Sequence, residues 1–156
     1  MAKRYWLMKS EPDVFSIADL KQKKTSLWDG VRNYQARNFM MKDMKVGDEI
    51  LFYHSNAKPP GVAGTAVVSA AAIPDPTALD KNSKYFDPKA SKENPIWYCV
   101  EVKFRAAFAG ILGLDEMKKM KPLKNMMVIK KGMRLSIQPV TPGEFKAVVD
   151  WAQSHD

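Results

Sequence analysis

Five apolar stretches of the chain are predicted to be β-strands, and they are separated by irregular lengths of chain. The stretches are residues 5–8, 48–55, 61–73, 96–108 and 135–140. A doubly wound parallel sheet needs regular crossover helices between its strands, and this spacing does not provide them. We therefore predict a mixed α/β protein of the α+β type, in which mostly antiparallel strands form a partly closed barrel flanked by helices.

Three helix starts are visible in the sequence. Ser16 and Asp19 have the spacing of a capping box, in which each side chain bonds the backbone N–H of the other residue. Thr141 and Glu144 have the same spacing and predict the start of the last helix. Asn33 is a typical helix N-cap and precedes a segment that is predicted to be helical as far as residue 44.

Residues 74–95 are the longest stretch without a predicted strand or long helix. They contain four prolines and many polar side chains. Long loops in compact domains commonly bind a ligand or cover a binding site. We see no repeat and no interdomain linker, so residues 1–156 are expected to form a single domain.

The cysteine and histidine content argues against disulfides and metal. Cys99 is the only cysteine, and the chain has two histidines, His54 and His155. No intrachain disulfide can form, and a structural zinc site is not expected. No glycine-rich phosphate loop is present, so no cofactor is expected. No run approaches the ~20 apolar residues of a membrane span.

We expect a cytoplasmic protein, with association to the nucleoid as an alternative, or a nuclear one if the source is eukaryotic.

The net charge of +8 favours a polyanionic partner. Residues 115–134 contribute seven basic residues and two acids. Such a run is either a solvated face or a phosphate-binding stripe, and Lys130 and Lys131 are the candidates for phosphate contact.

Residues 28–38 carry the strongest functional signal. The segment Trp-Asp-Gly-Val-Arg-Asn-Tyr-Gln-Ala-Arg-Asn gathers two aromatic rings, two guanidinium groups and three side-chain amides around one glycine. Arginine and asparagine are poor core residues, because a buried polar group costs free energy unless it is hydrogen-bonded. The same residue types suit a flat, polar, negatively charged ligand, since an indole stacks on a base and a guanidinium holds a phosphate.

Together with several other motifs, this segment resembles the EVE domain family, which belongs to the PUA-like superfamily and is related to YTH domains. The matching segments are residues 9–12, 28–38, 47–48, 52–56, 61–64 and 134–140. The resemblance implies a PUA-like pseudo-barrel with a pocket that accepts a single modified base, such as methylated or hydroxymethylated cytosine, from DNA or RNA.

Within that pocket we expect an aromatic stack and a polar edge. Trp28 and either Phe52 or Tyr53 would sandwich the base, although Trp28 is otherwise a candidate core residue. Polar groups would read the base edge, although Asn33 has the competing role of helix cap. The complete set of expected base-contacting residues is Ser10, Glu11, Trp28, Asn33, Phe52, Tyr53, His54, Ser55 and Gln138.

Five basic residues are expected to contact phosphate or the nucleic-acid backbone. They are Lys9, Arg32, Arg37, Lys130 and Lys131. The alternative for the two arginines is an ion pair with Asp29 or Asp43, which would contribute little at the surface.

We expect a non-catalytic binding module that is monomeric and has a nucleic acid as its partner. His54 and Ser55 do not form a nucleophile–base pair, because adjacent residues on a strand point to opposite faces. Two alternatives remain from the sequence: an RNA-binding adaptor without selectivity for modification, working with a protein partner, and a component of a nucleotide- or RNA-modifying enzyme.

Overall fold

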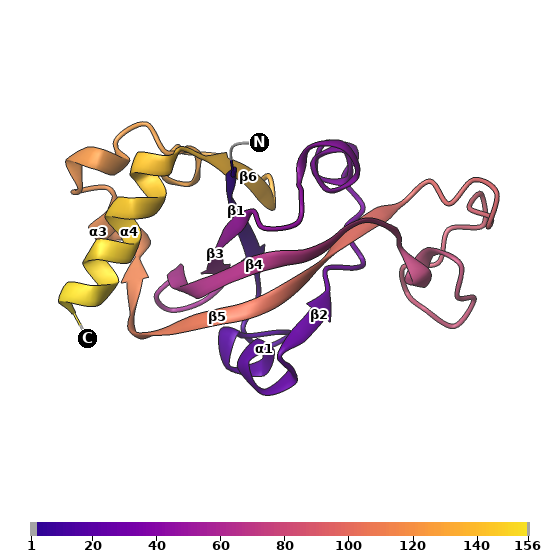
Figure 1. Cartoon of the computed structure of the whole chain (residues 1–156), viewed down its shortest axis with the longest axis horizontal. Coiled ribbons are helices and arrows are strands. Elements are labelled where there is room, and N and C mark those ends of the chain that lie inside the picture. Colours follow the sequence, from indigo (N-terminus) through magenta and orange to yellow (C-terminus); the bar gives the residue numbers. More distant parts are fainter. Residues whose placement is uncertain (1–2, 156) are drawn as a thin grey trace.

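A computed structural model describes residues 3–155 and contains one six-stranded sheet (Figure 1). The strands are β1 (Tyr5–Ser10), β2 (Thr25–Leu27), β3 (Glu49–His54), β4 (Gly61–Pro74), β5 (Tyr98–Gly113) and β6 (Ile137–Val140). The α-helices are α1 (Ile17–Lys23), α2 (Tyr34–Asn38), α3 (Leu114–Met117) and α4 (Pro142–Ser154). A π-helical turn, Phe39–Asp43, continues α2, and short 3-10 turns lie at Pro76–Ala78, Lys121–Leu123 and Met127–Ile129.

The strand order is β2-β5-β4-β3-β1-β6, and every neighbouring pair is antiparallel except β1 with β3. The prediction of a mostly antiparallel α+β fold is therefore confirmed. β4 and β5 are long and shift register several times along their pairing, which bends the sheet. In Figure 1 they run from α4 to the loop of residues 75–97 at the opposite end of the molecule.

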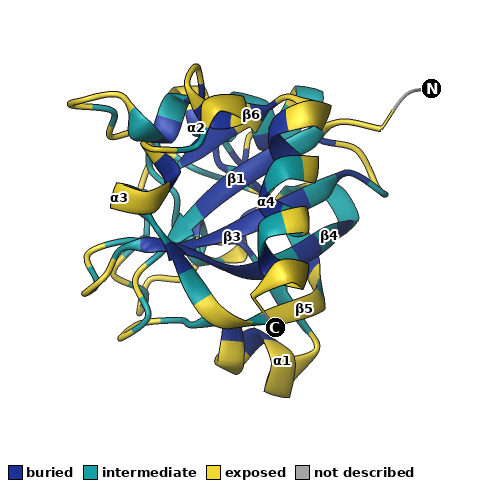
Figure 2. Ribbon diagram, turned by 90° about the vertical axis from the view of Figure 1, so that its left-hand side faces the viewer, coloured by how far each residue is buried: buried dark blue, intermediate teal, exposed yellow. Residues whose placement is uncertain are grey.

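Both faces of the central strands are buried (Figure 2). On β3, Ile50 and Phe52 belong to one apolar cluster, whereas Leu51 and Tyr53 belong to the other. This is the alternation that a strand with a period of two imposes. One cluster includes Trp28 and the buried residues of α1, and the other packs against α4 and residues 117–128.

A glycine allows a close approach within the sheet. A Cβ atom at Gly64 would lie 2.3 Å from the carbonyl oxygen of Ala106 and 2.8 Å from Ile17 of α1. Only a residue without a side chain therefore lets β5 and α1 pack against this part of β4.

The three predicted helix caps are all present. Ser16 and Thr141 each form a complete capping box, and the Asn33 side chain accepts a hydrogen bond from the Ala36 N–H at 2.9 Å. The strand predicted for residues 96–108 instead spans residues 98–113, because β4 pairs along its whole length, with Gly61 opposite Gly113. Within residues 3–155 no helix has the length and apolar character needed to cross a membrane.

Candidate base-binding pocket

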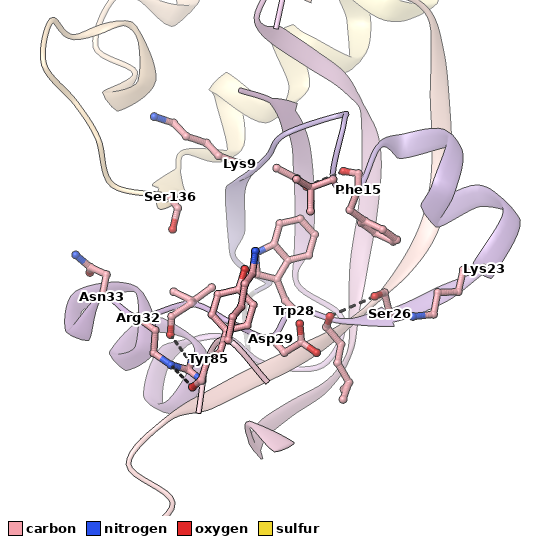
Figure 3. A pocket seen from close by; sticks show the side chains of 16 residues that line it. Lys9, Phe15, Lys23, Ser26, Trp28, Asp29, Arg32, Asn33, Tyr85 and Ser136 are labelled. Atoms are coloured by element: carbon pink, nitrogen blue, oxygen red, sulfur yellow. Dashed lines mark hydrogen bonds between the residues drawn. The ribbon is translucent and has the colours of Figure 1, made fainter. Parts of the chain in front are cut away.

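A pocket of about 710 Å³ opens beside the C-terminal end of β1 (Figure 3). This volume lies in the range of about 300–1,000 Å³ that is usual for ligand sites. Residues 9–10, 14–15, 26–33 and 84–85 supply most of its wall, together with Lys23 and Ser136. The pocket therefore joins the Trp-Asp-Gly segment to the long loop, which are far apart in the sequence.

Trp28 lies among the other labelled side chains of the pocket (Figure 3) and differs from the other tryptophans in its hydrogen bonding. The indole N–H groups of Trp6, Trp97 and Trp151 each donate to a carboxylate, at 2.8–3.0 Å. The indole of Trp28 has no such acceptor among residues 3–155, yet no buried side-chain polar atom there lacks a partner. Its N–H is therefore reached by solvent from the pocket, although the residue as a whole is only 8% exposed.

Phe52 and Tyr53 do not line this pocket. Phe52 is fully buried and packs edge-on against Trp28, with 5.5 Å between the ring centroids. Tyr53 belongs to the apolar cluster on the opposite face of the sheet. The aromatic side chains that do line the pocket with Trp28 are Phe15 and Tyr85, so the expected second wall comes from loops and not from β3.

Asn33 and Ser10 line the pocket, and each also makes a local hydrogen bond. The side-chain oxygen of Asn33 caps α2, which leaves its amide nitrogen for a ligand. The Ser10 hydroxyl donates to the carbonyl oxygen of Phe15 at 2.6 Å and thereby fixes the loop that follows β1. Both residues therefore combine a structural role with a place at the pocket wall.

Glu11, Ser55 and Gln138 lie outside the pocket lining. The Glu11 carboxylate accepts a hydrogen bond from Asn56 at 2.7 Å on the surface, and the backbone N–H of Ser55 donates to the Ser10 carbonyl oxygen. Gln138 is 1% exposed and donates to the carbonyl oxygen of Leu135 at 2.8 Å. These contacts hold the strand ends that carry the pocket.

His54 is a buried structural residue. Its Nε2 atom accepts a hydrogen bond from the backbone N–H of Ile17 at 3.1 Å, which ties the start of α1 to β3. The bond requires a neutral ring with its proton on Nδ1. Burial lowers the pKa of His54 below its ordinary value of 6.5.

The H54Q variant is expected to remove a component of the pH dependence of stability. As the pH falls, His54 takes up a proton in the unfolded chain at a higher pH than in the folded protein. The contribution of neutral His54 to the free energy of unfolding is therefore complete above about pH 6.5 and is lost as the pH falls through the lower folded-state pKa. Glutamine keeps an acceptor for Ile17 but does not titrate. Urea unfolding between pH 7.5 and 5 should show a steeper loss in the wild type, by at most about 1.4 kcal/mol per pH unit. Parallel pH profiles would contradict this assignment.

Arg32 holds the long loop through hydrogen bonds to Asp75, Thr77 and Tyr85, and we call this group of four residues the clamp. Its five guanidinium N–H groups are all used, donating to the carbonyl oxygens of Tyr85 and Val31, to the Asp75 carboxylate at 3.0 Å and to the Thr77 hydroxyl. Because no donor remains, the expected phosphate contact of Arg32 is replaced by a structural role.

Asp75 is the buried centre of this clamp and is 1% exposed. Burial raises the pKa of its carboxyl, but hydrogen bonds from Thr77, the Gly30 N–H and Arg32 outweigh burial and hold the pKa below its usual range. The long loop and the Gly30 turn are thus fixed to one ionised carboxylate.

Arg37 also has mainly structural contacts. It donates to the carbonyl oxygen of Ile96 at 2.8 Å and to the Asn38 side chain. Its guanidinium lies 4.7 Å from the ring centroid of Tyr34 and 5.8 Å from that of Trp97. These contacts favour a structural role for Arg37 over the expected phosphate contact, and its partners are neither Asp29 nor Asp43.

Gly30 brings Tyr85 to the pocket wall. It has a φ of +79°, and a Cβ atom there would lie 2.7 Å from the Tyr85 ring. The G30A variant is expected to displace Tyr85 and to lower base-dependent binding about tenfold, while unfolding at a urea concentration slightly below that of the wild type. Alanine at Gly47, which also has a positive φ (+96°) but whose Cβ would meet nothing within 4 Å, is the matched control. Unchanged binding by G30A would show that Tyr85 does not contribute to the pocket.

Lys9 connects the pocket to a second, basic hollow. This hollow has a volume of about 560 Å³ and is lined by Lys9, Lys118, Lys130, Lys131 and Arg134, with Tyr53 and apolar residues between them. Lys9 donates to the carbonyl oxygen of Met133 at 3.1 Å, and burial lowers its pKa. The basic run predicted from the sequence therefore lies next to the pocket.

The sequence did not identify several residues of the pocket. Tyr85 and Lys84 belong to the long loop, whose length was the only signal for a covering role, and Phe15 and Ser136 lie in short connections. Asp29 is part of the 28–38 segment, for which the sequence predicts only an ion pair between its carboxylate and an arginine.

A bent, mostly antiparallel sheet with an aromatic and polar pocket at its rim defines a small α+β domain with a candidate ligand site. The sequence profile of the EVE domain matches residues 4–151, and the chain belongs to this family. The family resemblance seen in the sequence is thereby confirmed.

Relatives with solved structures support the same fold. The chain is 44% identical to human thymocyte nuclear protein 1 in an alignment 164 positions long. The alignment covers 93% of this chain and 72% of the relative. A hypothetical protein from Leishmania major has 51% identity and a TM-score of 0.92, with 99% of this chain and 97% of that chain covered. The crystal structure of human THYN1 protein in complex with 5-methylcytosine containing DNA has 44% identity and a TM-score of 0.87, with 97% and 98% covered.

Proposed function

We propose that this chain is a non-catalytic nucleic-acid-binding protein whose pocket accepts a single modified base, with 5-methylcytosine in DNA as the first candidate. The observation that supports this most strongly is the pocket around Trp28, which has an available indole N–H and adjoins a basic hollow. The similarity to human THYN1 protein, solved with 5-methylcytosine containing DNA, supports the same ligand.

In this proposal the base lies against Trp28, with Phe15 and Tyr85 on the other walls of the pocket. Ser10 and the amide of Asn33 contact its polar edge. Lys9, Lys130 and Lys131 hold the neighbouring phosphates. A base leaves a duplex at a cost of a few kcal/mol, so single strands are expected to bind more tightly than duplexes of the same sequence.

The experiment is fluorescence anisotropy with labelled oligonucleotides that differ at one position, cytosine or 5-methylcytosine, at two salt concentrations. Tighter binding of the modified strand at both salt concentrations would support a base pocket. Equal binding of the two strands that disappears at high salt would show that the protein binds nucleic acid only through the charge of its basic surface.

The double variant K130Q/K131Q is expected to weaken binding of modified and plain strands by the same factor. Each lost phosphate contact lowers the slope of log K against log salt by about 0.7 for a single strand, so the slope should fall by about 1.4. K89Q/K92Q, which removes two exposed lysines of the long loop, is the charge-matched control. If both double variants change the slope equally, the hollow beside Lys9 has no special role.

The alternatives predict other results. An RNA-binding adaptor would bind plain and modified strands equally, and an enzyme component would convert a labelled nucleoside in a turnover assay.

We further propose that residues 1–156 act as one monomeric domain, of which residues 1–2 and 156 lie outside the described part. The name of the human relative supports a nuclear site of action in a eukaryotic cell.

A further inference from the structure

Asp29 is an acid in a pocket that we propose for a polyanion. It lines the pocket directly after Trp28 and is exposed to it. Within residues 3–155, no other residue donates a hydrogen bond to its carboxylate. Its own backbone N–H bonds to the carboxylate, which leaves the remaining acceptor positions of this exposed side chain open to the pocket.

The neighbouring charges do not neutralise Asp29. Arg32 uses all five of its N–H groups on other partners, and its ion pair is with Asp75. Partial burial raises the pKa of the Asp29 carboxyl, and Asp75 raises it further, whereas its own backbone N–H, Lys23 and Arg32 lower it by less. The surroundings thus leave this carboxylate in need of a hydrogen-bond donor.

A negative charge at this point repels the phosphates of a nucleic acid. It contributes to binding only if the ligand supplies an N–H group to it. The exocyclic amine of cytosine is such a donor, and aspartate is one of its usual acceptors. The O4 atom of thymine or uracil is an acceptor and would face the carboxylate unfavourably, leaving both groups unpaired.

We propose that Asp29 is a specificity-determining residue that accepts a hydrogen bond from the exocyclic amine of the bound base, so that the pocket selects an amino-bearing pyrimidine over an oxo-bearing one of the same size. This inference rests on the proposed function and concerns the same pocket. The pocket would then select a base for its exocyclic amine as well as for its methyl group. These two selections can be separated, because 5-methylcytosine and thymine both carry a 5-methyl group and differ at positions 3 and 4 of the ring.

The test uses single-stranded oligonucleotides that carry cytosine, 5-methylcytosine, uracil or thymine at one position. This set varies the methyl group and the amine independently. The wild type is expected to bind 5-methylcytosine at least about tenfold more tightly than thymine, the discrimination usual for one charged hydrogen bond.

The D29N variant is expected to reduce that ratio to less than about threefold, because an amide donates to O4 as readily as it accepts from N4. Its background affinity for all four strands should rise, since a repulsive charge is gone. D13N removes the same charge from an exposed residue outside the pocket lining and should keep the wild-type ratio. D29E, which retains a carboxylate, should still favour the amine.

An unchanged ratio of 5-methylcytosine to thymine affinity in D29N, in a wild type that distinguishes cytosine from 5-methylcytosine, would overturn this inference alone. A wild type that binds all four strands equally would overturn the proposed function as well. If D29N does not fold, loss of the amine preference in D29E would overturn the inference by itself.

Discussion

Replacing Trp28 with alanine is expected to abolish discrimination between modified and plain bases while leaving a salt-dependent background of binding. Stacking of a base on an aromatic side chain contributes about 1–3 kcal/mol, which corresponds to about 5- to 150-fold in the affinity for a base held in the pocket. Without this stack no base is held in the pocket, so the contact with the methyl group is lost as well. The background persists because Lys130, Lys131 and Arg134 lie in the adjacent hollow. Anisotropy titrations of the cytosine and 5-methylcytosine strands, at two salt concentrations, measure both effects.

The packing of Trp28 requires a second variant. Its ring contacts buried Phe52, so W28A is also expected to cost about 3 kcal/mol of stability, and its folded fraction must be measured by circular dichroism under the binding conditions. W28F retains a ring but has no indole N–H. It should keep most of the stacking and lose only what the N–H contributes. A folded W28A that still selects the modified strand would show that the base binds elsewhere.

Replacing Arg32 with alanine is expected to lower the free energy of unfolding by about 3 kcal/mol, because it leaves Asp75 buried without its ionic partner. The same change releases the Tyr85 carbonyl, which Arg32 holds with two hydrogen bonds. Base selectivity should therefore fall together with stability. Urea unfolding measures the first effect and anisotropy the second.

Two further variants separate charge from geometry at this clamp. R32K keeps the charge but not the planar five-donor arrangement, so it should lie between the wild type and R32A in stability. The double variant R32M/D75N removes both charges and is expected to be more stable than R32A. If R32A loses less than about 0.5 kcal/mol, the clamp does not hold the loop.

Local chemistry made much of the fold predictable. The period of two of a strand predicts that Ile50 and Phe52 share one face and that Leu51 and Tyr53 share the other, and the two apolar clusters divide these residues in this way. The helix starts at Ser16, Asn33 and Thr141 followed from capping chemistry within three residues. These features depend on neighbours in the sequence, which is why the residues themselves revealed them.

The walls of the pocket depended on contacts between distant segments. Either Phe52 or Tyr53 was expected to face the base, but Trp28 packs over Phe52 and Tyr53 lies on the opposite face of the sheet. Tyr85 reaches the pocket from a loop more than fifty residues away in the sequence from Gly30. Arg32 was expected to contact phosphate, but acceptors on Val31, Asp75, Thr77 and Tyr85 together use all five of its N–H groups. No local pattern indicates where a long loop returns to the sheet.

In the proposed function a single base enters the pocket at Trp28. Photocrosslinking with a strand that carries 5-iodocytosine at the test position, followed by peptide mapping, examines it most directly. We predict crosslinks to Trp28 and to the other pocket residues, Phe15 and Tyr85 among them, and their loss when excess 5-methylcytosine strand competes. Crosslinks confined to the basic residues 118–134, with none to the pocket, would contradict the account.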